Sequence, residues 1–447
     1  MPSLSNVSVL VAGAGLAGLA AARDLVTMGA TVTVIDARER VGGRVLTWRD
    51  PFTESQHAEA GGDFIDEAHT EIRTLAHELG LTLTRVLRGG FGYARADARG
   101  HVRIVGRNAM RSWERLSKQL SELRSRYRLV EKRWDSPITQ AIGRRSVGQW
   151  LDEVHADAEL RATATGLRGF FLADPDELSL LALVDQFSSD GAPLPGRTYR
   201  IEGGNDRLTQ ALATSLGDRL QLGCELVAVS HRGKNVRASL KRRREVAQLQ
   251  ADYLVFAMPA TLVRRIPMTP TLPVKQHEAL NRLAYGNVTK TSLQFSERFW
   301  RAPGRPRAFG TPLPIGAAWE ANEEQRGRPG ILTLLAGGGA SRQTQDIVSH
   351  EGVEGLVKRL DWLGWKDASL LASKQVSWEA DAWSRGGYAV FDASFDPALR
   401  EWLARPCDHL FFAGEHTSIA SQGYMNGAVE SGRRAAAEIE AAHALES

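Results

Sequence analysis

Cysteine is scarce in this chain. The sequence holds only Cys224 and Cys407 among 447 residues, which excludes a disulfide-dense fold, and their spacing suggests neither a metal site nor a redox pair. We therefore expect no metal, and we interpret both cysteines as buried free thiols in a reducing compartment.

Charge of one sign is not in excess either. The 56 Lys and Arg face 52 Asp and Glu, and the formal net charge is +4. One basic run, KRRR at 241–244, is typical of a solvated turn that connects two strands. Without a broad basic face or a recognisable binding module, the sequence predicts no nucleic-acid partner.

A long uninterrupted apolar run is also missing. The first apolar stretch, 7–22, is interrupted by three glycines and has no basic leader, so it fits neither a signal peptide nor a membrane span. The last segment, 433–447, is charged and rich in alanine, which argues against a tail anchor. With 43% apolar and 24% charged residues, the composition is that of a soluble globular protein. We expect two or three domains, no membrane partner and a cytoplasmic location.

The N-terminal segment has the pattern of a β-α-β unit. Residues 7–12 form a short β-branched apolar run, and residues 16–28 have helical composition and lead to Gly29, a plausible helix stop. Residues 31–36 form a second apolar run that is typical of a buried strand. A unit of this length is characteristic of nucleotide binding.

Three glycines and one acidic residue indicate what this unit binds. Gly13, Gly15 and Gly18 follow the first strand and open the helix, as in a dinucleotide fingerprint. The first glycine permits a tight turn, the second lets the backbone approach a pyrophosphate, and the third allows close packing of helix on strand. The helix N-terminus then faces the negative charge. Asp36 ends the second strand, where a carboxylate accepts hydrogen bonds from ribose hydroxyls.

Further elements follow along the chain. Helices are predicted near 66–80 and 108–132, the second of them amphipathic and expected to pack on its own domain. Residues 198–217 have the pattern of a strand, a glycine turn and a helix, and residues 220–256 alternate like strands. This order predicts a nucleotide domain assembled from separated pieces of sequence, with a helical and mixed domain inserted between them.

The segment DARERVGGR at 36–44 is more than an NAD site requires. It resembles the second FAD motif of the flavin amine oxidase family, which includes monoamine, polyamine and L-amino acid oxidases. In that resemblance Arg38 and Arg44 face the pyrophosphate of FAD, which suits guanidinium as a phosphate partner. The family commonly has Glu where this chain has Asp36, and either carboxylate can bind ribose.

The similarity covers most of the chain but is diffuse between about residues 90 and 190. The segment EAGG at 59–62 resembles the glycine turn beside the flavin ring, and RIEGG at 200–204 resembles the re-entry into the FAD domain. FFAGEHT at 411–417 and GYMNGA at 423–428 are similar to the C-terminal flavin signature. The resemblance implies that FAD contacts the following residues: Gly13, Gly15, Gly18, Asp36, Arg38, Gly42, Gly43, Arg44, Gly61, Gly62, Leu226, Trp378, Gly414, Glu415, Gly423, Tyr424, Met425 and Ala428.

Three positions carry the catalytic role that the resemblance implies. Lys290 coincides with the family lysine that reaches a water beside the reactive nitrogen of the flavin. Tyr388 and Tyr424 match two aromatic rings that flank the path of the amine. Gly387 stands where the mitochondrial monoamine oxidases carry the cysteine that attaches their flavin, so we expect FAD to be bound without a covalent bond.

Substrate contacts are expected at three further residues. Phe170 and Phe171 fall in the region that lines the family's cavity, although ordinary core packing explains them equally well. Arg197 falls where monoamine oxidases carry a neutral polar residue of the cavity wall. A buried guanidinium needs a partner. The partner would be a carboxylate such as Asp185 or Asp190, or else a carboxylate of the substrate.

The predicted fold class is α/β, with a Rossmann-like FAD-binding domain and an interleaved α+β substrate-binding domain. The FAD-binding domain is expected at 1–80, 198–265 and 389–447, and the substrate-binding domain at 81–197 and 266–388, with its helical part around 105–190.

The resemblance implies an oxidase that transfers a hydride equivalent from a small amine to FAD and is reoxidised by O2, giving H2O2. Two alternatives stay open: an FAD-dependent desaturase or dehydrogenase of a cyclic ketone or carboxylate, and a non-catalytic relative like the prenylated-GTPase carriers. The oligomeric state is also open, with a homodimer as one option.

Overall fold

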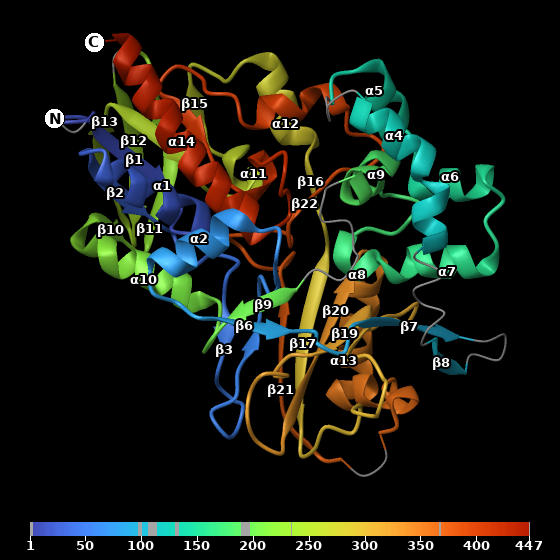
Figure 1. The fold of residues 1–447 in the computed structure, drawn as a ribbon. Coiled ribbons are helices and arrows are strands. Elements are labelled where there is room, and N and C mark those ends of the chain that lie inside the picture. The colour runs from blue at the N-terminus through green and yellow to red at the C-terminus, as the bar shows by residue number, and fades with distance from the viewer. Residues whose placement is uncertain are drawn as a thin grey trace.

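A computed structural model describes residues 3–96, 101–105, 114–129, 134–188, 197–233, 235–365 and 368–446. Figure 1 shows two sheets on opposite sides of the molecule, with a group of helices beside the second. Both ends of the chain lie on the side of the first sheet (Figure 1).

The first sheet has five parallel strands in the order β10-β2-β1-β14-β23. Its strands come from three distant parts of the sequence, and β1, β14 and β23 are almost entirely buried, as is usual for parallel strands that are covered on both faces. The strands are β1 (Ser8–Ala12), β2 (Thr31–Ile35), β10 (Leu220–Gln221), β14 (Tyr253–Phe256) and β23 (Leu410–Phe412).

Helices from both ends of the chain cover this sheet. α1 connects β1 to β2 and packs against α14, which in turn contacts α2, while α10 contacts α1. Apolar side chains of α1, including Leu19 and Leu25, are buried with Val429 and Ile439 of α14 in one core. These helices are α1 (Leu16–Thr27), α2 (Thr70–Glu78), α10 (Asp206–Leu216) and α14 (Met425–Glu446).

The second large sheet has seven strands in the order β21-β17-β20-β19-β18-β7-β8. Its neighbours are antiparallel except for β18 and β7, and α13 (Gly339–Lys358) packs on β17 and β20. The strands are β7 (Phe91–Ala96), β8 (Val102–Val105), β17 (Val288–Phe295), β18 (Ala308–Gly310), β19 (Ala317–Glu320), β20 (Gly330–Gly337) and β21 (Leu370–Ser377).

Short helices form a separate group beside this sheet (Figure 1). They are α4 (Ser121–Leu129), α5 (Pro137–Gly143), α6 (Val147–Glu153), α7 (Ala158–Gly166), α8 (Arg168–Phe171) and α9 (Leu180–Ser188). Ser136, Ser146 and Asp157 cap three of them, and each side chain accepts a backbone N–H of the first turn.

The remaining elements are smaller. A four-stranded sheet has the order β13-β12-β11-β15, a three-stranded sheet the order β5-β9-β6, and β3-β4 and β16-β22 are pairs. Their bounds are β3 (Thr47–Trp48), β4 (Ala58–Glu59), β5 (Ile65–Asp66), β6 (Leu83–Val86), β9 (Thr198–Ile201), β11 (Cys224–Ser230), β12 (Val236–Arg242), β13 (Glu245–Ala251), β15 (Met268–Thr269), β16 (Ala284–Tyr285) and β22 (Ala389–Val390). The last helices are α11 (Ala260–Val263), α12 (Val274–Arg282), η1 (Gly217–Arg219), η2 (Asp361–Leu363), η3 (Pro397–Leu403) and η4 (Glu415–Thr417).

Most of the predicted elements are present. The β-α-β unit is confirmed, the helix near 66–80 is α2, and the segment 198–217 folds as β9, a glycine turn and α10. Part of the helix predicted at 108–132 is α4, whereas residues 108–113 and 130–132 lie outside the described residues. The basic run 241–244 is exposed at the β12–β13 turn, as predicted.

One expectation about the cysteines is wrong in part. Cys224 is a buried free thiol, but Cys407 is only half-buried because it lies in the short loop before β23. Within the described residues, no helix combines the length and the apolar composition that crossing a membrane requires.

Candidate active site

One cavity of ≈ 1920 Å³ reaches from the glycine turn after β1 to the strands β17 and β19. It is larger than the volume of about 300–1,000 Å³ that is usual for a small-ligand pocket, so it has room for a dinucleotide together with a substrate. All but two of the predicted site residues line it; the two exceptions are Gly18 and Arg197.

The glycine turn has the geometry that its sequence predicts. Gly13 has φ +118°, and a Cβ at this position would lie 2.5 Å from the Ala257 carbonyl oxygen. At Gly15 no protein atom lies within 4 Å of such a Cβ, so this backbone is open to the cavity. At Gly18 a Cβ would lie 1.9 Å from the Gly13 carbonyl oxygen, which shows why Gly18 packs the helix on the turn and does not line the cavity.

Asp36 is held in place by backbone N–H groups at the end of β2. Its Oδ2 accepts the N–H of Ala14 at 2.8 Å, and its Oδ1 accepts the N–H of Arg38 at 2.8 Å. Burial raises the pKa of Asp36, although these hydrogen bonds and the charges of Arg38 and Arg40 act in the opposite direction. The oriented carboxyl group lines the cavity and has acceptor positions left for hydroxyl groups.

Arg38 and Arg44 line the cavity but also have partners in the protein. Nη2 of Arg38 lies 2.5 Å from Oδ1 of Asp381 and donates to Oγ of Ser384 at 2.9 Å. Nη1 of Arg44 donates to the Gly387 carbonyl oxygen at 2.6 Å and lies 3.0 Å from Oε1 of Glu415. The two arginines therefore tie the 381–387 segment to the glycine turn region.

Glu415 joins the C-terminal segments to the cavity. Oε1 of Glu415 accepts the N–H of Ala389 at 3.2 Å, and Oε2 accepts the N–H of Gly423 at 2.9 Å. Trp378 adds a further connection, because its indole N–H donates to the carbonyl oxygen of Ala60 at 3.0 Å. These contacts bring together segments that the sequence separates widely, and all of them line one cavity.

Lys290 is almost completely buried on β17, with 2% of its surface exposed. Its Nζ donates to the Gly61 carbonyl oxygen at 3.0 Å and to Oδ2 of Asp63 at 2.9 Å, and it lies 5.1 Å from the centre of the Trp319 ring. Asp63 lines the cavity, although the sequence analysis did not predict it as a site residue. A signal was present, because this acidic residue directly follows the glycines that the resemblance places beside the flavin.

Asp63 is bound from several sides. Its Oδ1 lies 2.6 Å from Nε of Arg200, and its Oδ2 also accepts the indole N–H of Trp319 at 3.1 Å. Burial raises the pKa of Asp63, but the charges of Arg200 and Lys290 outweigh burial and lower this pKa below its usual range. Asp63 is therefore ionised in the folded protein at neutral pH.

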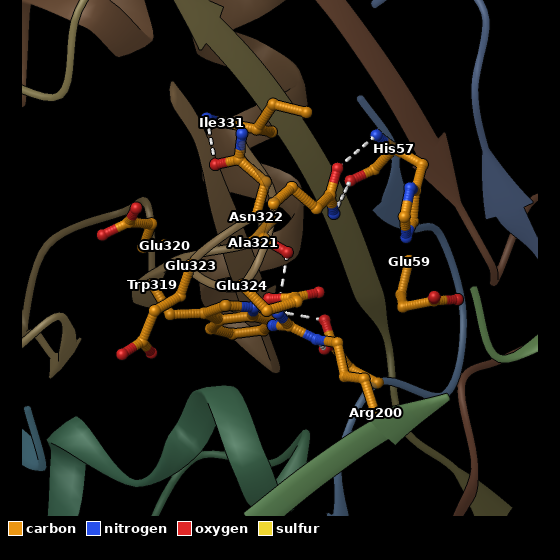
Figure 2. A network of polar contacts seen from close by, with 12 residues as sticks. His57, Glu59, Arg200, Trp319, Glu320, Ala321, Asn322, Glu323, Glu324 and Ile331 are labelled. Atoms are coloured by element: carbon orange, nitrogen blue, oxygen red, sulfur yellow. Dashed lines mark hydrogen bonds and ion pairs between the residues drawn. The ribbon is translucent and has the colours of Figure 1, made fainter. Parts of the chain in front are cut away.

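Arg200, the partner of Asp63, belongs to a larger polar network, which Figure 2 shows. Arg200 extends toward Glu324, whose Oε2 lies 3.2 Å from Nη1, and donates to the Ala321 carbonyl oxygen at 2.7 Å. Glu59 accepts the N–H of Asn205 and the hydroxyl of Thr47. Burial and the nearby charge of Asp63 raise the pKa of Glu59 to about 8, so it is mostly protonated at neutral pH.

Aromatic side chains form another part of the wall. Tyr388 donates its hydroxyl to the Phe170 carbonyl oxygen, and the ring of Phe170 lies 5.3 Å from that of Phe91. Tyr424 lies 4.8 Å from the ring of His69, a cavity residue that the sequence reading also missed. Burial raises the pKa of Tyr388, with smaller contributions from Tyr424 and Glu415, so its phenol stays neutral.

Comparison with known proteins decides the family. Residues 16–440 match the family described as flavin containing amine oxidoreductase. The chain belongs to this family. An amine oxidoreductase of this family is an enzyme that uses FAD, so the chain is a flavin-dependent oxidoreductase.

Relatives match the amine oxidoreductase over nearly its whole length. The protein AofH of Mycobacterium tuberculosis, which carries the name of a flavin-containing monoamine oxidase, is 29% identical and covers 98% of this chain and 97% of its own. Human flavin-containing amine oxidase B is 25% identical over 97% of this chain and 86% of its own. The structure of cyclohexylamine oxidase from Brevibacterium oxydans has a TM-score of 0.85 at 24% identity, covering 99% of this chain and 100% of that one. That likeness shows a shared fold.

The cavity of this amine oxidoreductase fits FAD. The open backbone at Gly15 leaves space next to the start of α1, where a pyrophosphate is favoured, and Asp36 offers an oriented acceptor for ribose. Gly387 provides no sulfur, and a Cβ there would lie 2.5 Å from Cδ1 of Leu172.

Besides Gly18, Arg197 is a predicted site residue that does not line the cavity. Arg197 is exposed just before β9, and its backbone N–H donates to Oε2 of Glu67 at 3.2 Å. Its guanidinium is open to water there, so it does not require a carboxylate partner. Asp185, offered as one such partner, lines the cavity and accepts the hydroxyl of Tyr127 at 2.6 Å. Asp190, the other, lies outside the described residues.

Proposed function

We propose that this protein is an FAD-dependent oxidase of a small amine. In the overall reaction the amine loses two electrons and two protons and becomes an imine, which water converts to a carbonyl compound and ammonia, or a primary amine when the substrate is a secondary amine. The electrons and protons pass by way of FAD to O2, which leaves as H2O2. The observation that carries this proposal is the shared cavity, in which the glycine turn, the buried Lys290 and the aromatic wall of Tyr388 and Tyr424 meet.

The division of labour within the chain follows from the sheets. We assign FAD binding to 1–80, 198–265 and 389–447, which supply all five strands of the parallel sheet. Substrate binding is assigned to 81–197 and 266–388, which supply the seven-stranded sheet and the group of short helices. The parallel sheet would then be the Rossmann-like unit of the enzyme.

When bound, FAD supplies the two-electron acceptor. The residues proposed to hold FAD lie in five places. These are the glycine turn after β1, the end of β2 and the segment that follows it, the glycines after β4, one position of β11, and the C-terminal segments that Glu415 joins. The residues are Gly13, Gly15, Asp36, Arg38, Gly42, Gly43, Arg44, Gly61, Gly62, Leu226, Trp378, Gly414, Glu415, Gly423, Tyr424, Met425 and Ala428, with Gly18 supporting the turn from behind.

The chain's own side chains orient the substrate and exclude water. The rings of Tyr388 and Tyr424 offer faces that attract an amine, and Phe170 and Phe171 add apolar surface to the same wall. Lys290 presents its ammonium to the same cavity and is held by Asp63. A small amine and O2 are the proposed partners, and we propose a cytoplasmic location because two free thiols suit a reducing compartment.

A desaturase of a cyclic ketone or carboxylate needs a base next to the carbon that loses a proton. His69 lines the cavity, and burial lowers its pKa, so its imidazole is neutral. Its Nδ1 accepts the N–H of Asp66 at 3.0 Å, which assigns the proton to Nε2 and leaves a donor as the remaining ring nitrogen. This arrangement gives the desaturase less support than the amine oxidase.

The function can be tested with a substrate panel. The purified protein should be yellow, and primary and secondary amines should bleach its flavin anaerobically and release H2O2 when O2 is admitted. Cyclic ketones and carboxylates serve as the matched alternative. If a ketone bleaches the flavin and yields the unsaturated product while no amine does so, the amine proposal is wrong.

A further inference from the structure

The ammonium group of Lys290 is only partly satisfied by the protein. An ammonium has three N–H donors, and contacts with Gly61 and Asp63 occupy two of them. Because Lys290 lines the cavity, one donor is left for a group inside it. The direction of that donor depends on the two contacts that fix Nζ.

Of these two contacts, only Asp63 is charged, and it is itself rigidly held. Arg200 binds Oδ1, and Trp319 binds Oδ2, so the carboxylate cannot turn away from Nζ without losing a buried hydrogen bond. Asp63 and Arg200 come from the segment after β4 and from β9, whereas Lys290 and Trp319 come from β17 and β19. The carboxylate therefore connects the segment that contains Gly61 and Gly62 to the seven-stranded sheet.

The charges around Lys290 balance only when Asp63 is present. Arg200 and Lys290 are the buried cations, and Asp63 and Glu324 are the carboxylates that pair with them. Glu59, whose pKa is raised by burial and by the charge of Asp63 to about 8, is mostly neutral at pH 7. Without Asp63, Arg200 would keep Glu324 as a partner, but Lys290 would lose the carboxylate with which it pairs, and a buried ammonium without a partner is costly to keep.

We propose that Asp63 is a positioning residue that holds Lys290 as an oriented ammonium at the cavity wall. The proposal rests on the proposed function only in taking O2 as the electron acceptor. A fixed cation stabilises negative charge that develops beside it, and charge develops on O2 when the first electron arrives. Overall, fully reduced FAD gives two electrons and two protons to O2, and FAD and H2O2 result.

The test follows reoxidation without any amine. The flavin of the holoenzyme is reduced with dithionite, the excess is removed, and reoxidation by O2 is followed in stopped flow from pH 6 to 10. Asp63→Asn removes the charge but keeps the size. We expect reoxidation at least tenfold slower than wild type at high pH and recovery toward the wild-type rate at low pH, where the lysine regains its proton. Asp63→Glu should restore most of the rate.

Two further variants separate positioning from general damage. Glu324→Gln removes the other carboxylate on Arg200 without touching Lys290 and should reoxidise within about twofold of wild type. Asp63→Asn combined with Lys290→Met should behave like Lys290→Met alone, because Asp63 acts through the lysine. The double variant can be compared with Lys290→Met even if the single Asp63→Asn protein does not fold, because the double variant buries no unpaired lysine.

The FAD dissociation constant and the visible spectrum of each variant supply readouts besides turnover. A pH profile of Asp63→Asn that superimposes on wild type would overturn the proposal. A loss that is equal at every pH, or that persists in the Lys290→Met background, would also overturn it. None of these results bears on the choice of amine, so failure here and failure of the proposed function are distinguishable.

Discussion

The pKa of Glu59 shows how strongly burial can change the titration of one residue. Its carboxyl lies in the network behind the cavity, where burial and the charge of Asp63 raise its pKa from 4.5 to about 8. The folded protein therefore binds a proton that the unfolded chain releases above about pH 4.5. The stability from this proton is fully present below pH 4.5 and is lost as the pH rises through 8.

A Glu59→Gln variant tests this residue. Glutamine keeps the shape but does not titrate, so the free energy of unfolding should lose the part of its pH dependence that Glu59 causes. That part is about 1.4 kcal/mol per pH unit for one proton between the two pKa values. Urea unfolding of the FAD-free protein between pH 5 and 9 measures it. Parallel curves for the variant and wild type would show that Glu59 does not change its charge on folding.

At the scale of elements, the turn between β1 and α1 separates two roles of glycine. A Cβ at Gly15 meets no protein atom within 4 Å, whereas a Cβ at Gly18 would lie 1.9 Å from the carbonyl oxygen of Gly13. Gly15→Ala should therefore leave the stability of the FAD-free protein within about 1 kcal/mol and weaken FAD binding at least tenfold. Gly18→Ala should destabilise the FAD-free protein itself.

Thermal unfolding of the FAD-free variants and fluorescence titration with FAD measure the two effects. The pair is matched, since both variants add one methyl group to the same turn. Equal loss of stability in both variants would contradict the assignment of Gly15 to the cofactor and Gly18 to packing.

At this scale the sequence predicted contacts between residues that are close together in the chain better than contacts between distant residues. The β-α-β unit and the strand, turn and helix at 198–217 rest on neighbouring residues, and the structure confirms both. The ion pair of Asp63 and Lys290 joins residues 227 apart, and no local pattern reports such a contact. The prediction that Arg197 lines the cavity was wrong for a related reason. The loop before it can shift the alignment to the family by one or two positions.

At the scale of the whole molecule, the cavity is lined by segments from near both ends of the chain and from its middle. A ligand that binds only this assembled form stabilises the entire fold. Because Gly387 cannot attach the flavin, precipitation by acid should leave all FAD in the supernatant. The melting temperature of the FAD-free protein should then rise with added FAD, and FAD at 100 times its dissociation constant should add about 2.7 kcal/mol.

Differential scanning fluorimetry over a series of FAD concentrations measures this effect. AMP, which fits the ribose end alone, is the matched control and should stabilise less. Flavin that remains with the precipitated chain would contradict non-covalent binding. A melting temperature that does not change with FAD would contradict a cavity formed only in the folded molecule.

The order of strands in the parallel sheet has a consequence for biosynthesis. β14 ends at Phe256, and its neighbour β23 begins at Leu410, so a ribosome must translate the whole stretch between them before the sheet is complete. At about 5–20 residues per second this takes roughly 8–30 s, during which one edge of β14 has no partner strand. A growing chain in this state exposes the apolar surface that Phe411 and Phe412 later cover, and exposed apolar surface of this kind is what chaperones bind.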